Sequence, residues 1–139
     1  MTKITKEVRE LVLLQLFSHT FHQGESGEIA FIEDVEEASE VDREAVKEIF
    51  FAIQEREEEI LASIGKFAKN WSITRIAKVE LAALKLAIYE MSYYEPAVEP
   101  AVSINAAIEM VKKYGNERGY RFVNGVLDAY RKECVGASK

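Results

Sequence analysis

The stretch that decides the fold is residues 72–91, SITRIAKVELAALKLAIYEM. Its apolar residues recur at steps of three and four, which is the spacing of one helix face. They are Ile76, Val79, Ala83, Leu84, Ala87, Ile88 and Met91. Only a narrow polar strip remains, with Ser72 as the candidate N-cap. This pattern is typical of a helix buried at the centre of a helical protein.

Upstream of this segment, the same spacing predicts two long helices. The first covers about residues 3–21, and the second covers about residues 42–67, with Asp42 as its N-cap. A short helical connector is expected at residues 29–39.

Downstream, the sequence predicts two further helices. Ser103 is the candidate N-cap of the first, and Gly115 is placed to form its left-handed C-cap. The second covers about residues 117–132, where Gly125 removes side-chain bulk at a point where another helix could approach. Strand-like alternation of useful length is missing. We therefore predict an all-α protein of about six or seven helices.

Length and composition agree with one globular domain. The chain has 139 residues, of which 48% are hydrophobic and 30% charged, so a disordered chain or a disulfide scaffold is excluded. A single cysteine, Cys134, suits a reducing cytosol. The sequence lacks both the roughly 20-residue apolar run of a membrane span and a signal-peptide cleavage pattern. We expect a cytoplasmic protein with no membrane contact.

Charge is divided unevenly along the chain. The formal net charge of −6 argues against binding nucleic acid through bulk positive charge. Residues 1–72 hold eight basic and sixteen acidic side chains, whereas residues 73–139 hold ten and eight. Residues 112–132 alone hold six basic and two acidic side chains. A small local site for an anion is therefore compatible with an acidic chain.

Catalytic patterns are weak. There is no phosphate-binding glycine loop and no nucleophile in a recognisable turn. His19 and His22 have only Glu25 nearby as a third ligand, and Cys134 has no histidine base close in sequence. We expect no enzyme activity, no metal site and no cofactor.

The segment 112–125, KKYGNERGYRFVNG, mixes cations with aromatic rings. Basic groups neutralise phosphates and rings stack on unpaired bases, so the mixture suits single-stranded RNA. Tyr120 and Phe122 could equally fill the core between helices. The predicted turn also exposes the N-terminus of a helix, whose free N–H groups attract anions.

Four motifs in this chain resemble the bacterial transcription antitermination factor NusB family. They are WSITRI at 71–76, LKLAIYEM at 84–91, SINAAIEMVK at 103–112 and RFVNGVLD at 121–128. The resemblance implies a fold of two packed small helical bundles, at about residues 1–70 and 71–139, in a single NusB-like domain. It also implies an RNA-binding antitermination factor that binds boxA RNA with the small-subunit ribosomal protein NusE and helps RNA polymerase to transcribe ribosomal RNA operons.

The resemblance places the RNA-binding residues on the N-terminal stretch and on the turn before FVNG. The residues carried over are Arg118, Tyr120, Arg121 and Phe122, with Asn124 as either a polar contact or a residue that fixes the helix. Lys3, Lys6 and Arg9 keep positive charge on the N-terminal stretch, and Lys113 is a further candidate for RNA binding. Family members commonly begin with an arginine-rich run, whereas Glu7 and Glu10 interrupt the basic residues here. We therefore expect weak binding to RNA alone and a strong dependence on the partner protein.

Candidates for the partner face lie on the polar side of the central helix. They are Arg75, Lys78, Glu80 and Lys85, for which ordinary solvation is the alternative. A helical interaction module that has lost RNA recognition stays open as a second function, and both a monomer and a homodimer stay open. Related domains precede a catalytic domain in some ribosomal RNA cytosine methyltransferases, but with an end at Lys139 we expect no methyl transfer here.

Overall fold

The computed structural model describes residues 4–19, 40–69, 71–116 and 118–136. These residues form six α-helices and two short helical turns, and no strand occurs among them. The helices are α1 (Lys6–His19), α3 (Glu40–Glu55), α4 (Glu57–Phe67), α5 (Lys78–Ser92), α6 (Pro100–Tyr114) and α7 (Gly119–Tyr130). The turns are η1 (Ile73–Arg75) and the π-helical η2 (Arg131–Gly136). The predicted all-α class is confirmed, whereas the connector at 29–39 lies outside the described residues.

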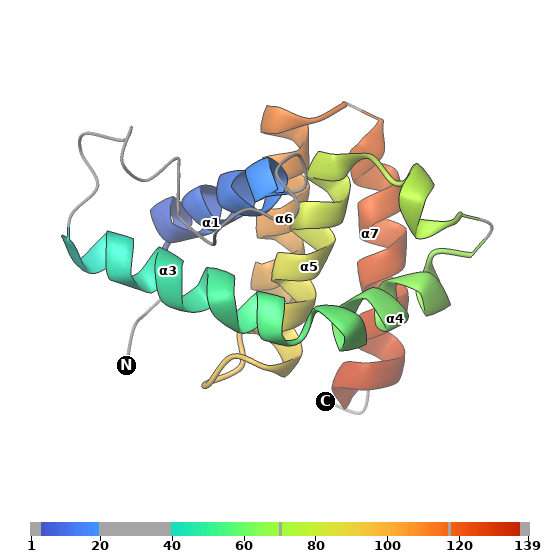
Figure 1. Cartoon of the computed structure of the whole chain (residues 1–139). Helices are drawn as coiled ribbons and strands as arrows, with labels where there is room; N and C mark the ends of the chain where they lie inside the picture. The colour runs from blue at the N-terminus through green and yellow to red at the C-terminus, as the bar shows by residue number, and fades with distance from the viewer. Residues whose placement is uncertain (1–3, 20–39, 70, 117, 137–139) are drawn as a thin grey trace.

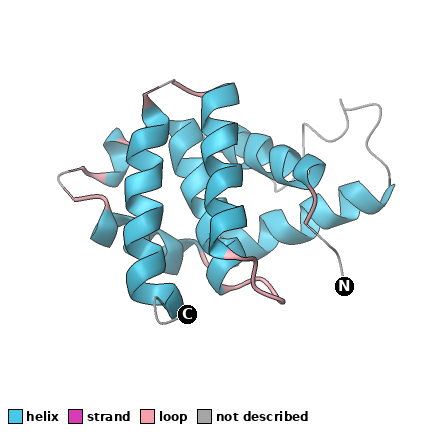
Figure 2. Ribbon diagram, turned by 180° about the vertical axis from the view of Figure 1, so that it is seen from behind, coloured by secondary structure: helices cyan, strands magenta, loops and turns pink. Residues whose placement is uncertain are grey.

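Helix α5 is the centre of the structure. It contacts α1, α3, α4, α6 and α7, as Figure 1 shows. Eleven of its fifteen residues are buried, which agrees with the narrow polar strip of its sequence. Figure 2 shows α6 and α7 packed side by side. The buried apolar side chains form one continuous cluster that includes residues of all six helices, and the division into two bundles near residue 70 stays a prediction.

The single long helix predicted over residues 42–67 is wrong. The chain turns at Arg56, whose φ of −109° and ψ of 16° separate α3 from α4. This turn lets α4 pack against α5 and α7, while α3 packs against α1. Apolar residues continue in helical spacing across the turn, so the sequence does not reveal it. Asp42 is not an N-cap, because α3 already begins at Glu40.

Two further predicted helix caps are also wrong. Ser72 precedes the η1 turn, and α5 begins only at Lys78. Ser103 lies inside α6, which begins at Pro100, because the first turn of a helix does not need the N–H that proline lacks.

Glycine roles differ from the prediction as well. Gly115 is extended, with φ of −117° and ψ of −157°, and not left-handed. Open space surrounds Gly125, whereas Gly119 is the glycine at a close approach, since a β-carbon there would collide with the Glu80 carboxylate.

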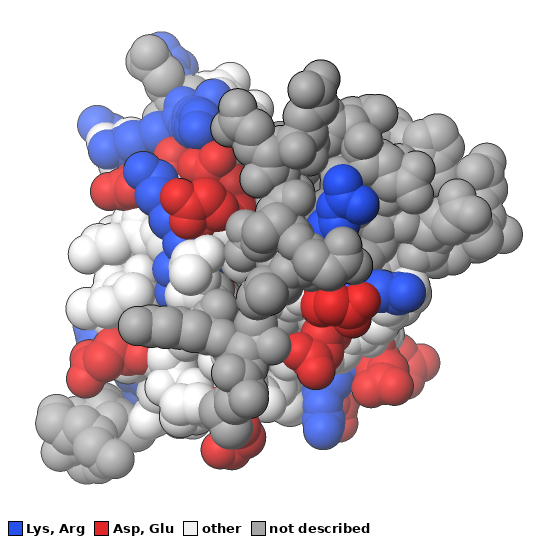
Figure 3. Space-filling view, turned by 90° about the vertical axis from the view of Figure 1, so that its left-hand side faces the viewer, with Lys and Arg blue, Asp and Glu red and all other residues white. Residues whose placement is uncertain are grey.

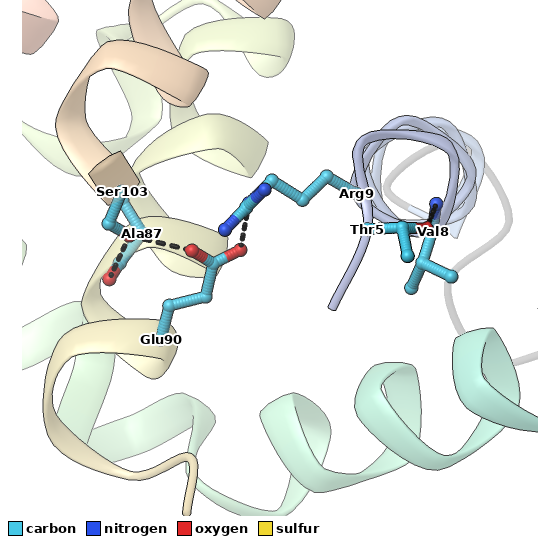
Figure 4. Close-up of polar contacts among 6 residues, drawn as sticks. All are labelled: Thr5, Val8, Arg9, Ala87, Glu90 and Ser103. Carbon is cyan, nitrogen blue, oxygen red and sulfur yellow. Dashed lines mark hydrogen bonds and ion pairs between the residues drawn. The ribbon is translucent and has the colours of Figure 1, made fainter. Parts of the chain in front are cut away.

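A buried polar network fastens α1 to α5 and α6 (Figure 4). The Nε–H of Arg9 donates to Glu90 Oε2 at 2.8 Å, and the hydroxyl of Ser103 donates to Glu90 Oε1 at 2.8 Å. The Glu90 side chain is 1% exposed and that of Arg9 is 12% exposed. Burial raises the pKa of Glu90, and the bonds from Arg9 and Ser103 oppose that rise.

Replacement of Arg9 by alanine is expected to lower the free energy of unfolding by about 3 kcal/mol, because a buried carboxylate would lose its cation. Urea unfolding followed by circular dichroism measures the change. The matched control is Arg56→Ala, which removes an exposed pair with Glu59 and should cost less than about 1 kcal/mol. Equal effects of the two variants would contradict the structural role of Arg9.

The cost of Arg9→Ala should also depend on pH. A carboxyl whose pKa is raised in the folded protein stabilises the fold most below its unfolded pKa, and this contribution disappears as the pH rises through the folded pKa. Loss of Arg9 removes an interaction that holds the pKa of Glu90 down. The stability deficit of the variant is therefore expected to be smaller at pH 5 than at pH 8. A deficit independent of pH would show that Glu90 does not titrate in this way.

Candidate nucleic-acid interface

The C-terminal turn of α6 and the first turn of α7 bring cations and an aromatic ring together. Lys112 Nζ lies 4.4 Å from the centre of the Tyr120 ring, and the Arg121 guanidinium lies 5.9 Å from it. Arg121 lowers the pKa of the Tyr120 hydroxyl, chiefly through hydrogen bonding. Two cations thus hold one side chain that can itself stack on a base.

On its other side, α6 meets α1. Lys113 Nζ donates to both Glu10 carboxylate oxygens at 3.2 Å, and the Tyr114 hydroxyl donates to Glu10 Oε1 at 3.0 Å. A recess of about 120 Å³ lies between the two helices, with Lys6 and Arg9 also in its wall. Side chains of the last turn of α6 therefore contact both α1 and α7.

We name this surface the basic strip, defined by Lys6, Lys112, Lys113, Arg118 and Arg121. All five side chains are exposed. Figure 3 keeps the α6–α7 turn at the top and shows basic side chains gathered there, with carboxylates directly beneath them. The strip is therefore a local positive surface with acidic groups along its border.

The predicted RNA-binding residues near the start of α7 differ in exposure. Arg118, Arg121 and Asn124 are exposed, and Tyr120 is half-buried. Phe122 is also half-buried and packs against Trp71, with ring centres 5.6 Å apart. The turn before FVNG thus combines exposed polar side chains with aromatic rings that are partly packed against the protein.

Arg9 differs from the other predicted cations, because its Nε is bonded to the buried Glu90 and most of its side chain is covered. Lys6 is exposed, whereas Lys3 lies outside the described residues. The N-terminal part of the strip is therefore poorer in free charge than the sequence predicts.

The expectation of an exposed polar side on α5 is wrong at two positions. Lys85 is buried, and its Nζ donates to Glu57 at 2.8 Å. Glu80 is buried beneath Gly119, and burial raises its pKa. Arg75 and Lys78 are exposed. Partner contact by these residues stays a prediction.

Four residues of this region were not named among the predicted RNA-binding residues, although Lys112 and Tyr114 lie in the segment 112–125 that the sequence singles out. Lys112 could have been found from its place in the last turn of α6, beside the predicted Lys113. Glu10, Tyr114 and Trp71 had no local signal for their pairings, because each meets a residue about fifty or more positions away.

Within the described ranges, no group of three or more histidine, cysteine or acidic side chains could hold a metal ion. His22 and Glu25 are outside these ranges. No described helix is both long and apolar enough to span a membrane.

The sequence of the chain is similar to those of a known protein family. The NusB family model matches residues 6–132. The transcription antitermination protein NusB of Methylacidiphilum infernorum is 35% identical over 130 residues, which cover 92% of this chain and 90% of that protein. The NusB protein of Clostridium botulinum strain Kyoto is 38% identical over 138 residues, which cover 88% of this chain and 95% of that protein.

Comparison with solved structures also gives NusB proteins. NusB of T. maritima superposes with a TM-score of 0.86 at 31% identity, covering 99% of this chain and 97% of that chain. A chain in a crystal structure of the antitermination factors NusB and NusE in complex with double-stranded RNA superposes with a TM-score of 0.75 at 29% identity, covering 91% of this chain and 95% of that chain. On these grounds, the chain belongs to the NusB family of transcription antitermination proteins.

Proposed function

We propose that this protein binds boxA-type single-stranded RNA together with NusE, and so promotes transcription of ribosomal RNA operons within the RNA polymerase antitermination complex. The observation that carries the proposal is the basic strip around Tyr120, on the turn before FVNG. The similar fold found in a complex of NusB and NusE with double-stranded RNA supports binding to RNA together with NusE. We place this action in the cytoplasm and assign it no catalytic step.

The chemistry of the strip favours unpaired RNA. Exposed Arg118 and Arg121 can neutralise phosphates, while the half-buried rings of Tyr120 and Phe122 can stack on bases that are not paired. A duplex hides its bases in its own stack, so it would use only the cations of the strip.

The same geometry explains why a partner protein is needed. Arg9 is paired with the buried Glu90, and the carboxylate of Glu10 offsets the charge of Lys113. Few free cations remain, so RNA affinity and its salt dependence should both be low for the chain alone. NusE would supply further contacts, and exposed Arg75 and Lys78 are our candidates for meeting it.

A gel-shift titration tests this function. It compares a boxA-type RNA with a scrambled RNA, with and without NusE, at two salt concentrations. We expect a clear preference for boxA that strengthens on addition of NusE. Equal retention of both RNAs under every condition would refute specific recognition.

Arg121→Ala is expected to weaken boxA binding several-fold in this assay. Loss of one phosphate contact should reduce the slope of log K against log salt by about 0.7. The matched control is Arg56→Ala, an exposed arginine at the α3–α4 turn, which should leave binding unchanged. An unchanged slope for Arg121→Ala would remove this residue from the interface.

Glu10→Gln is expected to strengthen RNA binding by up to about fivefold, the equivalent of about 1 kcal/mol for an exposed ion pair. The substitution frees Lys113 from its carboxylate and removes a charge that repels phosphate. Glu7→Gln is the matched control, because Glu7 lies exposed on the same helix and carries the same charge. Equal gains from both variants would indicate a general charge effect instead.

A second candidate function is a helical module that binds NusE but not RNA. The internal engagement of Arg9 and Lys113 is the observation that favours it. Capture of NusE with no further gain for boxA over scrambled RNA would support this second function over the first.

A further inference from the structure

The only tryptophan of the chain stands beside the basic strip and is not explained by the core. Trp71 keeps 51% of its surface exposed, the largest fraction among the exposed large hydrophobic residues of the described chain. Its ring contacts Phe122 at a centre-to-centre distance of 5.6 Å and an angle of 58°. Phe122 follows Arg121 directly in α7. A second ring thus supports the indole, while about half of its surface remains free for another planar group.

A groove lies between the C-terminal ends of α4 and α7, the helix that also carries Phe122. Its volume is about 610 Å³, and it is lined by Lys66, Phe67, Lys69, Ala129, Lys132 and Glu133. Residues 122, 125, 129 and 132 share one side of α7 by helical spacing. Gly125 has no side chain there, and no atom lies within 4 Å of where a β-carbon would be. The glycine keeps the surface open between Phe122 and Ala129.

The groove carries positive charge. Three of its six lining residues are lysines, and one is acidic. Lys66 pairs with Glu133 at 3.0 Å, and Lys132 pairs with Asp128 at 3.3 Å. Lys69 is exposed and has no ion pair among the described residues. Lys69 is also the lysine closest in sequence to Trp71.

We propose that the RNA path extends past Phe122, so that a base outside the core element stacks on Trp71 and the following phosphates run along the α4–α7 groove, with Lys69 as their first contact. This inference rests on the proposed RNA-binding function. Two observations select a nucleic acid as the occupant. Helical spacing places the groove on the same side of α7 as Phe122, about two helical turns beyond it. Trp71 and the groove lysines together offer an exposed ring and cations, as single-strand binding surfaces do.

Figure 1 shows why the continuation is geometrically natural. The η1 turn and α4 lie on the same side of α7, whereas α6 lies against α7 elsewhere. Along α7, Phe122 and its partner Trp71 lie nearer the α6–α7 turn than Ala129 and Lys132 do, so RNA that crosses this turn would arrive at Trp71 before it reaches the groove.

Tryptophan fluorescence tests the inference directly, because Trp71 is the single reporter in the chain. The protein is titrated at low salt with a core boxA-type RNA and with the same RNA extended by about four nucleotides at either end, the lower limit of the strand length that one single-strand binding fold covers. We expect one extended RNA to quench Trp71 and to bind about fivefold or more tightly than the core. Arg121-dependent binding of every RNA without quenching or gain from extension would overturn the inference and leave the proposed function standing.

Variants separate stacking from folding. Trp71→Ala should abolish the gain from extension, whereas Trp71→Phe should keep most of it, since a phenyl ring still packs on Phe122 and stacks. Phe51→Ala, which removes a partly exposed ring on α3, is the control and should retain the gain. Lys69→Glu should lower the gain, and Lys47→Glu, the same charge change on α3, should not.

Two further results would count against this RNA path. Quenching by NusE alone, with no response to RNA length, would assign Trp71 to the protein partner and overturn the inference. Failure of every RNA to bind, with and without NusE, would instead refute the proposed function itself.

Discussion

The buried ion pair between Arg9 and Glu90 is the interaction on which the arrangement of the surface depends. Glu90 is a carboxylate on the most buried helix of the structure, and it can stay charged at 1% exposure only if hydrogen-bond donors surround it. Those donors come from α1 and α6, through Arg9 and Ser103. The requirement of one carboxylate thereby fixes two helices against α5. It also sets Glu10, one residue beyond Arg9, opposite Lys113 and Tyr114, which makes the α1–α6 edge of the candidate interface.

This arrangement leaves some basic residues paired with carboxylates and others exposed to solvent. Arg9 forms an ion pair with the buried Glu90, and Lys113 forms one with Glu10, so neither cation is wholly available to a phosphate. Arg118 and Arg121, at the start of α7, lie exposed and next to the open N-terminal end of a helix. The balance of free charge therefore shifts from α1 toward α7. Under the proposed function, long-range attraction for RNA would be weak, and selectivity would depend on close contacts with bases and on a second protein.

The sequence was a good guide to the helices and a poor guide to what joins them. Helical spacing located α5 as the central element because nearly all of its surface is covered. The same spacing hid the turn at Arg56, because apolar residues continue across it. Ile53 of α3 and Ile60 of α4 are both buried in the core. It also suggested Ser103 as a cap, although this hydroxyl is needed inside to bond Glu90. At the candidate site, composition and the family resemblance both pointed to the turn before FVNG, and RNA binding there stays a prediction. The engagement of Arg9 and the burial of Lys85 depend on Glu90 and Glu57, which are distant in sequence and carry no local signal.

Aromatic packing connects these observations with the extended RNA path. Phe122 lies half-buried at the border between core and surface, so its ring packs in the fold and could also meet a base under our proposal. Its packing against Trp71 orients an indole that is half exposed. A ring held in this way loses less conformational freedom when a base stacks on it than a free side chain would. Since the net charge of −6 denies the protein long-range attraction for RNA, such pre-ordered contacts are the ones from which it can gain affinity.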